Sequence, residues 1–353
     1  MGDADFEALA LELFGLQFKH NPAYRRLCEA RGARSESVTS WTAIPAAPTS
    51  AFKELDLSCL PVAERTTVFH SSGTTRQKPS RHYHNGESLA VYEASLLGWF
   101  ATHCQWPMAN GQSNATGSSA EGRLAIGNWQ LAILTPPPTH APHSSLVHMF
   151  ETIRQKSGVD GTAFVGRVAE DGAWALDMQT VRDRLNAASD RLQPLLLLGT
   201  AFSFVHLLDY LAEHDLRFRL PPGSCALETG GYKGRSRTLL KPALHALISQ
   251  RLGIPRAHIV CEYGMSELSS QAYDSVIEVF HFPPWARVQI ISPETGREAA
   301  EGETGLIRVL DLANVYSVMA IQTEDLGVRR GNGFELAGRA ALAEPRGCSL
   351  MAV

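Results

Sequence analysis

The sequence is organised around one stretch of small and hydroxylated residues, Ser71-Ser72-Gly73-Thr74-Thr75-Arg76-Gln77-Lys78-Pro79-Ser80-Arg81. The β-branched run 66–69 precedes it and the run 81–84 follows it, and this pattern predicts a loop between two strands. Gly73 permits a close backbone approach to a ligand, the hydroxyl groups can bond phosphate oxygens, and Lys78 adds positive charge. We therefore predict a phosphate-binding loop. An ordinary polar hairpin loop fits the local composition equally well.

Composition and charge narrow the class of protein. The chain has 353 residues, a net charge of −4 and 44% hydrophobic residues, which suffices for a large core in one or two domains. The near-neutral charge gives no electrostatic argument for a nucleic-acid partner. No apolar run approaches the ~20 residues that span a bilayer. The six scattered cysteines form no Cys-x2-Cys pair, so we expect a cytoplasmic protein with free thiols.

Short apolar runs alternate with longer helical patterns over most of the chain, which favours an α/β fold with a parallel sheet. Helical spacing of apolar residues predicts helices at 3–20, 22–30, 87–103, 202–212 and 239–252, and a helix that opens near 142–148. Strands are expected at 129–134, 162–168, 194–198 and 257–261.

The pattern changes beyond about residue 279. Short strands at 287–291, 305–310, 319–323 and 334–336 are separated by Gly-rich turns, which predicts a small antiparallel β subdomain. We therefore predict two parts: an α/β core with the N-terminal helices in residues 1–278, and a β subdomain with a C-terminal tail in 279–353.

Three later motifs give the central loop a specific context. They are Glu228-Thr229-Gly230-Gly231-Tyr232-Lys233-Gly234-Arg235, then Tyr263-Gly264-Met265-Ser266-Glu267, then Gln322-Thr323-Glu324-Asp325-Leu326-Gly327 with Gly338-Arg339 beyond it. Their order resembles that of the adenylate-forming enzymes, the acyl- and aryl-CoA ligase superfamily, from about residue 66 to about residue 348. The resemblance implies the N-terminal-type domain of those enzymes, with mixed or parallel sheets flanked by helices.

Within that superfamily the chain most resembles the LuxE-type acyl-protein synthetases of bacterial bioluminescence. The similar segments are 229–235, 199–206 and the terminal Arg346-Gly347-Cys348-Ser349-Leu350. Ordinary CoA ligases continue for about 100 residues as a mobile C-terminal domain, a typical domain size. The resemblance implies that this domain, and the lysine that it supplies, are absent here.

The resemblance implies a reaction in two steps. A carboxylate is a poor electrophile, and ATP overcomes this by forming an acyl-adenylate with AMP as the leaving group. Such a site needs phosphate donors, Mg²⁺ and positive charge where negative charge accumulates. We therefore expect ATP and Mg²⁺ as cofactors and a carboxylic acid, a fatty acid by resemblance, as the substrate.

The motifs suggest a role for each of their residues. The loop residues Ser71, Ser72, Gly73, Thr74, Thr75 and Lys78 would hold the β- and γ-phosphates, with Arg76 where the superfamily commonly has glycine. Glu267 is the predicted Mg²⁺ ligand, because a hard cation prefers carboxylate oxygen and usually keeps several waters. Alternatively, Glu267 only complements the dipole of a helix N-terminus.

The remaining nucleotide contacts follow from the resemblance. Asp325 would accept hydrogen bonds from the ribose, and Arg339 would contact ribose or phosphate. The other predicted nucleotide-binding residues surround the adenine and the α-phosphate: Thr229, Gly230, Gly231, Tyr263 (stacked on the base), Gly264 and Ser266 (at the α-phosphate).

The acid-binding residues are weaker predictions. His143 and His206 would lie near the substrate carboxylate or the wall of the acyl pocket, and Phe202 and Phe204 would line that pocket. Each histidine can equally be structural. Lys233, Arg235 or Arg237 would replace the charge of the lysine in the absent domain.

Cys348 is the predicted acyl acceptor, because a thiolate attacks an acyl-adenylate readily and the thioester remains reactive. The acyl group would then pass to a partner protein such as a reductase or carrier. The alternative for Cys348 is a small packing residue. Two other functions remain open: an acid:CoA or acid:carrier-protein ligase, and a catalytically silent nucleotide-binding partner subunit.

Overall fold

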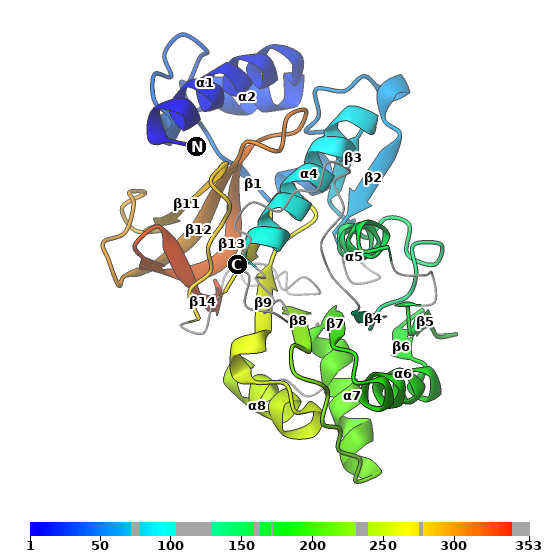
Figure 1. Cartoon of the computed structure of the whole chain (residues 1–353). Helices are drawn as coiled ribbons and strands as arrows, with labels where there is room; N and C mark the ends of the chain where they lie inside the picture. Colours follow the sequence, from blue (N-terminus) through cyan, green and yellow to red (C-terminus); the bar gives the residue numbers. More distant parts are fainter. Residues whose placement is uncertain are drawn as a thin grey trace, which may run out of the picture.

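Two five-stranded sheets form the frame of the molecule (Figure 1). The computed structural model describes residues 1–71, 78–103, 129–158, 163–170, 172–230, 239–274 and 278–340. No helix in these ranges is long and apolar enough to cross a membrane.

The first sheet is mainly parallel, as the sequence predicted, and has the strand order β10-β9-β8-β7-β4. Its strands are β4 (Gln130–Ile133), β7 (Leu195–Thr200), β8 (Cys225–Thr229), β9 (Ile259–Tyr263) and the antiparallel β10 (Ala272–Tyr273). Every residue of β7 is buried, because helices cover both faces of the sheet.

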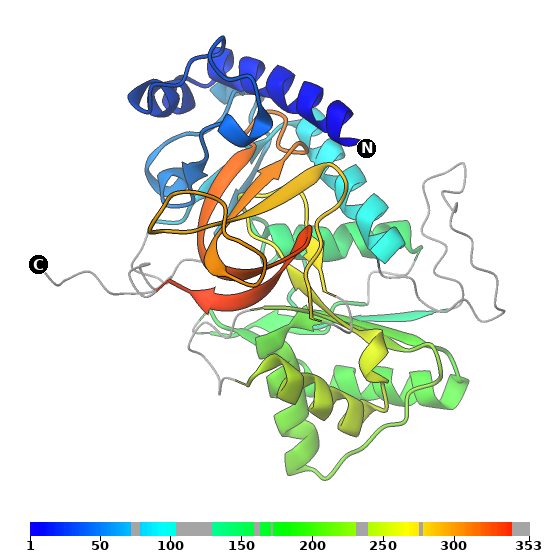
Figure 2. The same cartoon turned by 90° about the vertical axis from the view of Figure 1, so that its left-hand side faces the viewer.

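Two layers of helices enclose this sheet, one on each face (Figures 1 and 2). On one face lie α6 (Met178–Arg191), α7 (Ala201–Glu213) and α8 (Lys241–Leu252); on the other lie α4 (Gly86–His103) and α5 (Ser145–Lys156). The sequence predicted all of these except α6. It also did not predict β6 (Trp174–Leu176), which forms a hairpin with β5 (Gly166–Val168).

The second sheet is antiparallel except at one edge. It contains β11 (Ala286–Ile291), β12 (Thr304–Asp311), β13 (Ala320–Arg330) and β14 (Gly333–Arg339). β1 (Ala47–Pro48) joins it by pairing in parallel with β13. The C-terminal strands were therefore predicted, but the contribution of an N-terminal strand was not.

The N-terminal helices α1 (Asp3–His20) and α2 (Pro22–Ala30) pack against this second sheet (Figure 2). Gln17 is fully buried there, and its Nε2 donates to the carbonyl of Asn314 at 2.8 Å. Asn21 caps α2, accepting a hydrogen bond from the Tyr24 amide at 3.0 Å. The predicted boundary at residue 278 therefore does not separate two hydrophobic cores, because residues 1–57 share one core with strands from the C-terminal part.

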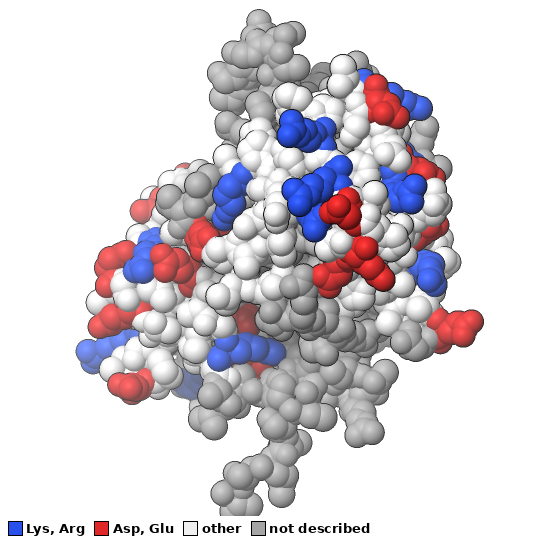
Figure 3. All heavy atoms as spheres, turned by 90° about the horizontal axis from the view of Figure 1, so that it is seen from below, with Lys and Arg blue, Asp and Glu red and all other residues white. Residues whose placement is uncertain are grey.

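A separate hairpin carries the central loop. Its strands β2 (Thr67–His70) and β3 (Arg81–His84) pair antiparallel, with His70 opposite Arg81, as the sequence predicted. The remaining short elements of the described ranges are α3 (Ala51–Glu54) and 3₁₀ turns at Trp41–Ala43, Val62–Glu64 and Arg256–His258. On the face seen in Figure 3, basic and acidic side chains are interspersed among uncharged ones.

Candidate active site

The carboxyl ends of the parallel strands bring two of the predicted motifs together. Thr229 at the end of β8 is paired with Glu262 near the end of β9. Gly230 and Gly264 are the first residues after these two neighbouring strands. In open α/β sheets this edge is the usual place for a ligand. A Cβ atom at Gly230 would have no described neighbour within 4 Å, which leaves room for a ligand against the backbone.

The base of the central loop contacts the Tyr263–Glu267 motif. Ser71 Oγ accepts a hydrogen bond from the Ser80 amide at 2.9 Å, and Ser80 Oγ lies 3.4 Å from Ser266 Oγ. His82 Nδ1 donates to the Ser266 carbonyl at 2.9 Å. Burial lowers the pKa of His82 to about 4, so its imidazole is neutral at neutral pH. Segments 186 residues apart therefore meet at one point.

Glu267 lies in a turn that follows β9. Because it does not begin a helix, complementing a helix dipole does not explain it. Its side chain is buried and accepts a hydrogen bond from the Ser266 hydroxyl at 3.0 Å, while its carbonyl accepts from Asn314 Nδ2 at 2.9 Å. No ion pair joins Glu267 to a basic side chain within the described residues, so the carboxylate is suited to a cation.

The donor set around Glu267 fits Mg²⁺. No group of three or more His, Cys, Asp or Glu residues in the described ranges could hold a metal by itself. Mg²⁺ does not need such a cage, because it is commonly bound by one or two carboxylates together with waters and substrate phosphates.

Tyr263 connects the β9 motif to the third and fourth motifs. Its hydroxyl donates to Asp325 Oδ2 at 3.0 Å, and Arg339 Nε lies 3.3 Å from Asp325 Oδ1. Arg339 also pairs with Glu324 at 2.7 Å, so two carboxylates hold its guanidinium group. The Tyr263 ring packs edge-on against Phe334, with 5.2 Å between centroids.

Lys78, which lies between β2 and β3, and His143, which contacts β2, are both near the hairpin. Lys78 Nζ is 3.5 Å from a carboxylate oxygen of Glu54, and both side chains are mostly exposed. His143 Nδ1 donates to the Val68 carbonyl at 3.2 Å, and its ring lies 4.6 Å from that of His70. The structure thus places His143 beside the loop, and its role at the substrate carboxylate remains a prediction.

The acid-pocket predictions on α7 separate into two groups. Phe202 and His206 share one face of the helix, with ring centroids 4.3 Å apart, and His206 is exposed. Phe204 is fully buried in the core between α7 and its neighbours. Phe204 is therefore a packing residue in this structure, and the prediction that it lines the acyl pocket is not supported.

Several predicted residues lie outside the described ranges, and their roles remain predictions from the sequence. They are Ser72, Gly73, Thr74, Thr75, Gly231, Lys233, Arg235, Arg237 and Cys348.

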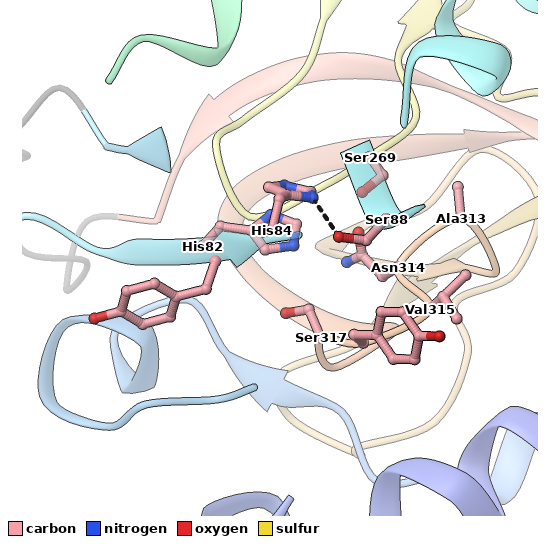
Figure 4. A pocket seen from close by; sticks show the side chains of 10 residues that line it. His82, His84, Ser88, Ser269, Ala313, Asn314, Val315 and Ser317 are labelled. Atoms are coloured by element: carbon pink, nitrogen blue, oxygen red, sulfur yellow. Dashed lines mark hydrogen bonds between the residues drawn. The ribbon is translucent and has the colours of Figure 1, made fainter. Parts of the chain in front are cut away.

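Sequence reasoning missed Asn314, which bonds the Glu267 carbonyl, and the polar residues around it. Figure 4 shows them lining a small pocket behind β3, where His84 Nδ1 lies 3.2 Å from Ser88 Oγ. Asn314 and Ser269 line the same pocket. The alternation of His82 and His84 in a short strand is the signal that could have indicated their burial, since both face inward.

Comparison with known proteins identifies the family of the chain. Residues 161–352, more than half of the chain, match the family of LuxE acyl-protein synthetases. A long-chain-fatty-acid–luciferin-component ligase of Aliivibrio fischeri is 21% identical over 361 residues, covering 98% of this chain and 86% of that protein. The Vibrio harveyi protein of the same name is 21% identical over 347 residues, covering 94% and 83%.

Among solved structures, the fold is similar to that of a 2-hydroxyisobutyryl-CoA ligase in its postadenylation state with 2-HIB-AMP. The TM-score is 0.64 at 14% identity, covering 98% of this chain and 66% of that one. At this identity the likeness establishes the fold, which is the α/β fold predicted from the sequence. Taken with the family match, it follows that the chain belongs to the LuxE family of acyl-protein synthetases and has the fold of an adenylate-forming ligase.

Proposed function

We propose that this chain is an ATP-dependent ligase that activates a carboxylic acid as an acyl-adenylate and then passes the acyl group to a thiol. In the first step a carboxylate oxygen attacks the α-phosphorus and pyrophosphate leaves. In the second step a thiolate attacks the acyl carbon, AMP leaves and a thioester forms. The observation that carries the proposal is the contact chain from Ser80 through Ser266 and Glu267, and from Tyr263 to Asp325.

Four residues of the candidate site have defined tasks in the proposed adenylation. The Ser266 hydroxyl would donate to the α-phosphate, and the Asp325 carboxylate would accept from the ribose hydroxyls. Lys78 is attached to the loop that would hold the outer phosphates, and its weak surface ion pair with Glu54 leaves it able to turn towards them. Glu267 would hold Mg²⁺, which, when bound, offsets phosphate charge.

We propose a fatty acid as the substrate, supported by the names of the bacterial relatives, which are long-chain-fatty-acid ligases. The thiol is that of Cys348, and a partner protein such as a reductase or carrier then takes the acyl group. Family membership supports a protein as the acyl acceptor, because the family is named for acyl-protein synthesis.

The proposal is tested by measuring pyrophosphate release from ATP with a panel of aliphatic, aryl and hydroxylated acids. We expect acid-dependent release that requires Mg²⁺, together with acylation of the protein itself. Consumption of free CoA without protein acylation would replace this proposal with an acid:CoA ligase. Absence of release with every acid would indicate a catalytically silent nucleotide-binding subunit.

A further inference from the structure

A row of hydrogen-bonding side chains crosses the parallel sheet at its carboxyl edge. Cα pairing aligns Thr200 with Thr229, Thr229 with Glu262, and Glu262 with Tyr273. Residues paired in this way point to the same face of a sheet. All four are at least nine-tenths buried. The layer directly below them is apolar and belongs to the core under α4 and α5: Leu198, Leu227 and Val260.

Glu262 extends from this row to the bare backbone of Gly264. A Cβ atom at Gly264 would overlap a carboxyl oxygen of Glu262, and it would lie 3.6 Å from Cγ of Gln271. Glu262 and Gln271 thus meet beside a glycine that stands two residues before Ser266. Only glycine can occupy position 264 without displacing the Glu262 carboxyl.

Both side chains are buried, and one of them has a polar atom without a described hydrogen-bond partner. Gln271 is 5% exposed, and its Oε1 has no hydrogen-bond partner among the described residues. Glu262 is also 5% exposed and forms no ion pair with a described basic side chain. Buried polar groups are normally paired, so the unpaired Oε1 of Gln271, whose side chain lies at the same glycine as the Glu262 carboxyl, is open to a ligand group that completes the pairing.

The carboxyl of Glu262 can both donate and accept. Burial raises its pKa to about 7, the hydrogen bond from Thr229 opposes this shift, and the charge of Glu228 adds to it. A large fraction of the carboxyl is therefore protonated near neutral pH, and a protonated carboxyl has one donor and one acceptor. A ligand hydroxyl, which also donates and accepts, complements Glu262 and Gln271 together.

We propose that Glu262 and Gln271 select acids that carry a hydroxyl group close to the carboxyl, so that the substrate is a hydroxylated fatty acid. This inference rests on the proposed function. If Ser266 contacts the α-phosphate, the reacting carboxylate lies beside it, and the next carbons of the acid lie beside Gly264. A purely alkyl acid would leave Gln271 Oε1 unpaired and the Glu262 carboxyl with only its hydrogen bond from Thr229 in a buried site, which a hydrogen-bonding site penalises strongly.

The experiment compares kcat/KM for acid-dependent pyrophosphate release between two acids of equal length, one hydroxylated at the second or third carbon and one unsubstituted. We expect the wild-type protein to prefer the hydroxylated acid by about 10- to 100-fold. Glu262→Leu should bring that ratio close to one, whereas Glu262→Gln, which still donates and accepts, should keep most of it. Gln271→Leu should lower the ratio.

Gln289→Leu is the matched control. Gln289 is also 5% exposed with an unpartnered Oε1, but it lies on β11 of the second sheet. This variant should leave the substrate ratio unchanged. A wild-type ratio near one, or a ratio that survives Glu262→Leu, would overturn the inference while leaving acid activation intact. The wild-type ratio decides the matter even if Glu262→Leu does not fold. Absence of pyrophosphate release with every acid would instead contradict the proposed function.

Discussion

At the scale of single residues, Glu267 is a buried carboxylate with a hydroxyl donor and no described basic partner. We expect Glu267→Gln to keep the hydrogen bond from Ser266 but to lower Mg²⁺-dependent pyrophosphate release roughly 100-fold or more, since a bound metal supplies several kcal/mol of charge stabilisation. Thermal unfolding should change little, because the amide has the same shape. Wild-type release at every Mg²⁺ concentration would contradict the metal assignment.

Asp325 has a structural task as well as the proposed ribose contact, because it accepts from the Tyr263 hydroxyl. Tyr263→Phe separates the two, since it removes that bond and keeps the ring. We expect Asp325→Ala to raise the KM for ATP by about 10- to 150-fold, the effect of losing charged hydrogen bonds. Tyr263→Phe should raise it much less. Equal effects would show that Asp325 mainly positions Tyr263, and a raised acid KM alone would exclude the ribose role.

The site residues that could be predicted lie in sequence motifs, whereas those that were missed depend on contacts between distant segments. Tyr263, Ser266 and Asp325 lie in motifs whose order is visible in the chain. Glu262 precedes such a motif, and its importance depends on burial and on Thr229 of another strand, which no local pattern records. The burial of Phe204 could have been predicted from the sequence. Helical spacing puts Phe202 and His206 on one face of α7, and Phe204, two residues after Phe202, then lies on another face.

At the scale of elements, the sequence predicts what local patterns encode. The hairpin strands, the Asn21 cap and the alternation of strands with helices all follow from spacing or from turn chemistry. The parallel pairing of β1 with β13 could not be predicted in this way. A strand of two residues has no periodicity, and its partner lies more than 270 positions away in the sequence.

The attachment of α1 to the second sheet depends on Gln17. Its amide donates to the Asn314 carbonyl at 2.8 Å, and its Oε1 accepts from the Met319 amide at 3.1 Å. Gln17→Leu would leave these buried backbone groups unpaired, at about 1–3 kcal/mol each. We expect urea denaturation to show a loss of roughly 2–6 kcal/mol in the free energy of unfolding.

Gln179→Leu provides the control, because Gln179 is on α6, where its amide bonds Asp183 at the surface. This change should alter the free energy of unfolding by less than about 0.5 kcal/mol. Equal stability of the Gln17 and Gln179 variants would mean that α1 contributes little to the core that it shares with the C-terminal strands.

At the scale of the whole molecule, the proposed activation and transfer steps use different parts of the chain. In the proposal, activation depends on the contacts between the hairpin, the Glu267 turn and Asp325. The proposed transfer needs a reactive thiol, and most of the described cysteines are poor candidates. Burial raises the pKa of Cys28 to about 11 and that of Cys59 to about 12, and raises that of Cys261 as well, so their thiolate fractions at neutral pH are small. Cys348, outside the described residues, remains the predicted acceptor.

Variants of these residues separate the two steps. After incubation with ATP and a labelled acid, wild-type protein should carry a hydroxylamine-sensitive acyl label. Cys348→Ser should release pyrophosphate at a normal rate but lose that label, because an alcohol is a much weaker nucleophile at neutral pH. Cys59→Ser should keep both signals, and Lys78→Ala should lose both, because no adenylate forms. Full labelling of Cys348→Ser would move the acceptor to another cysteine, whereas loss of pyrophosphate release in that variant would contradict the separation of activation from transfer.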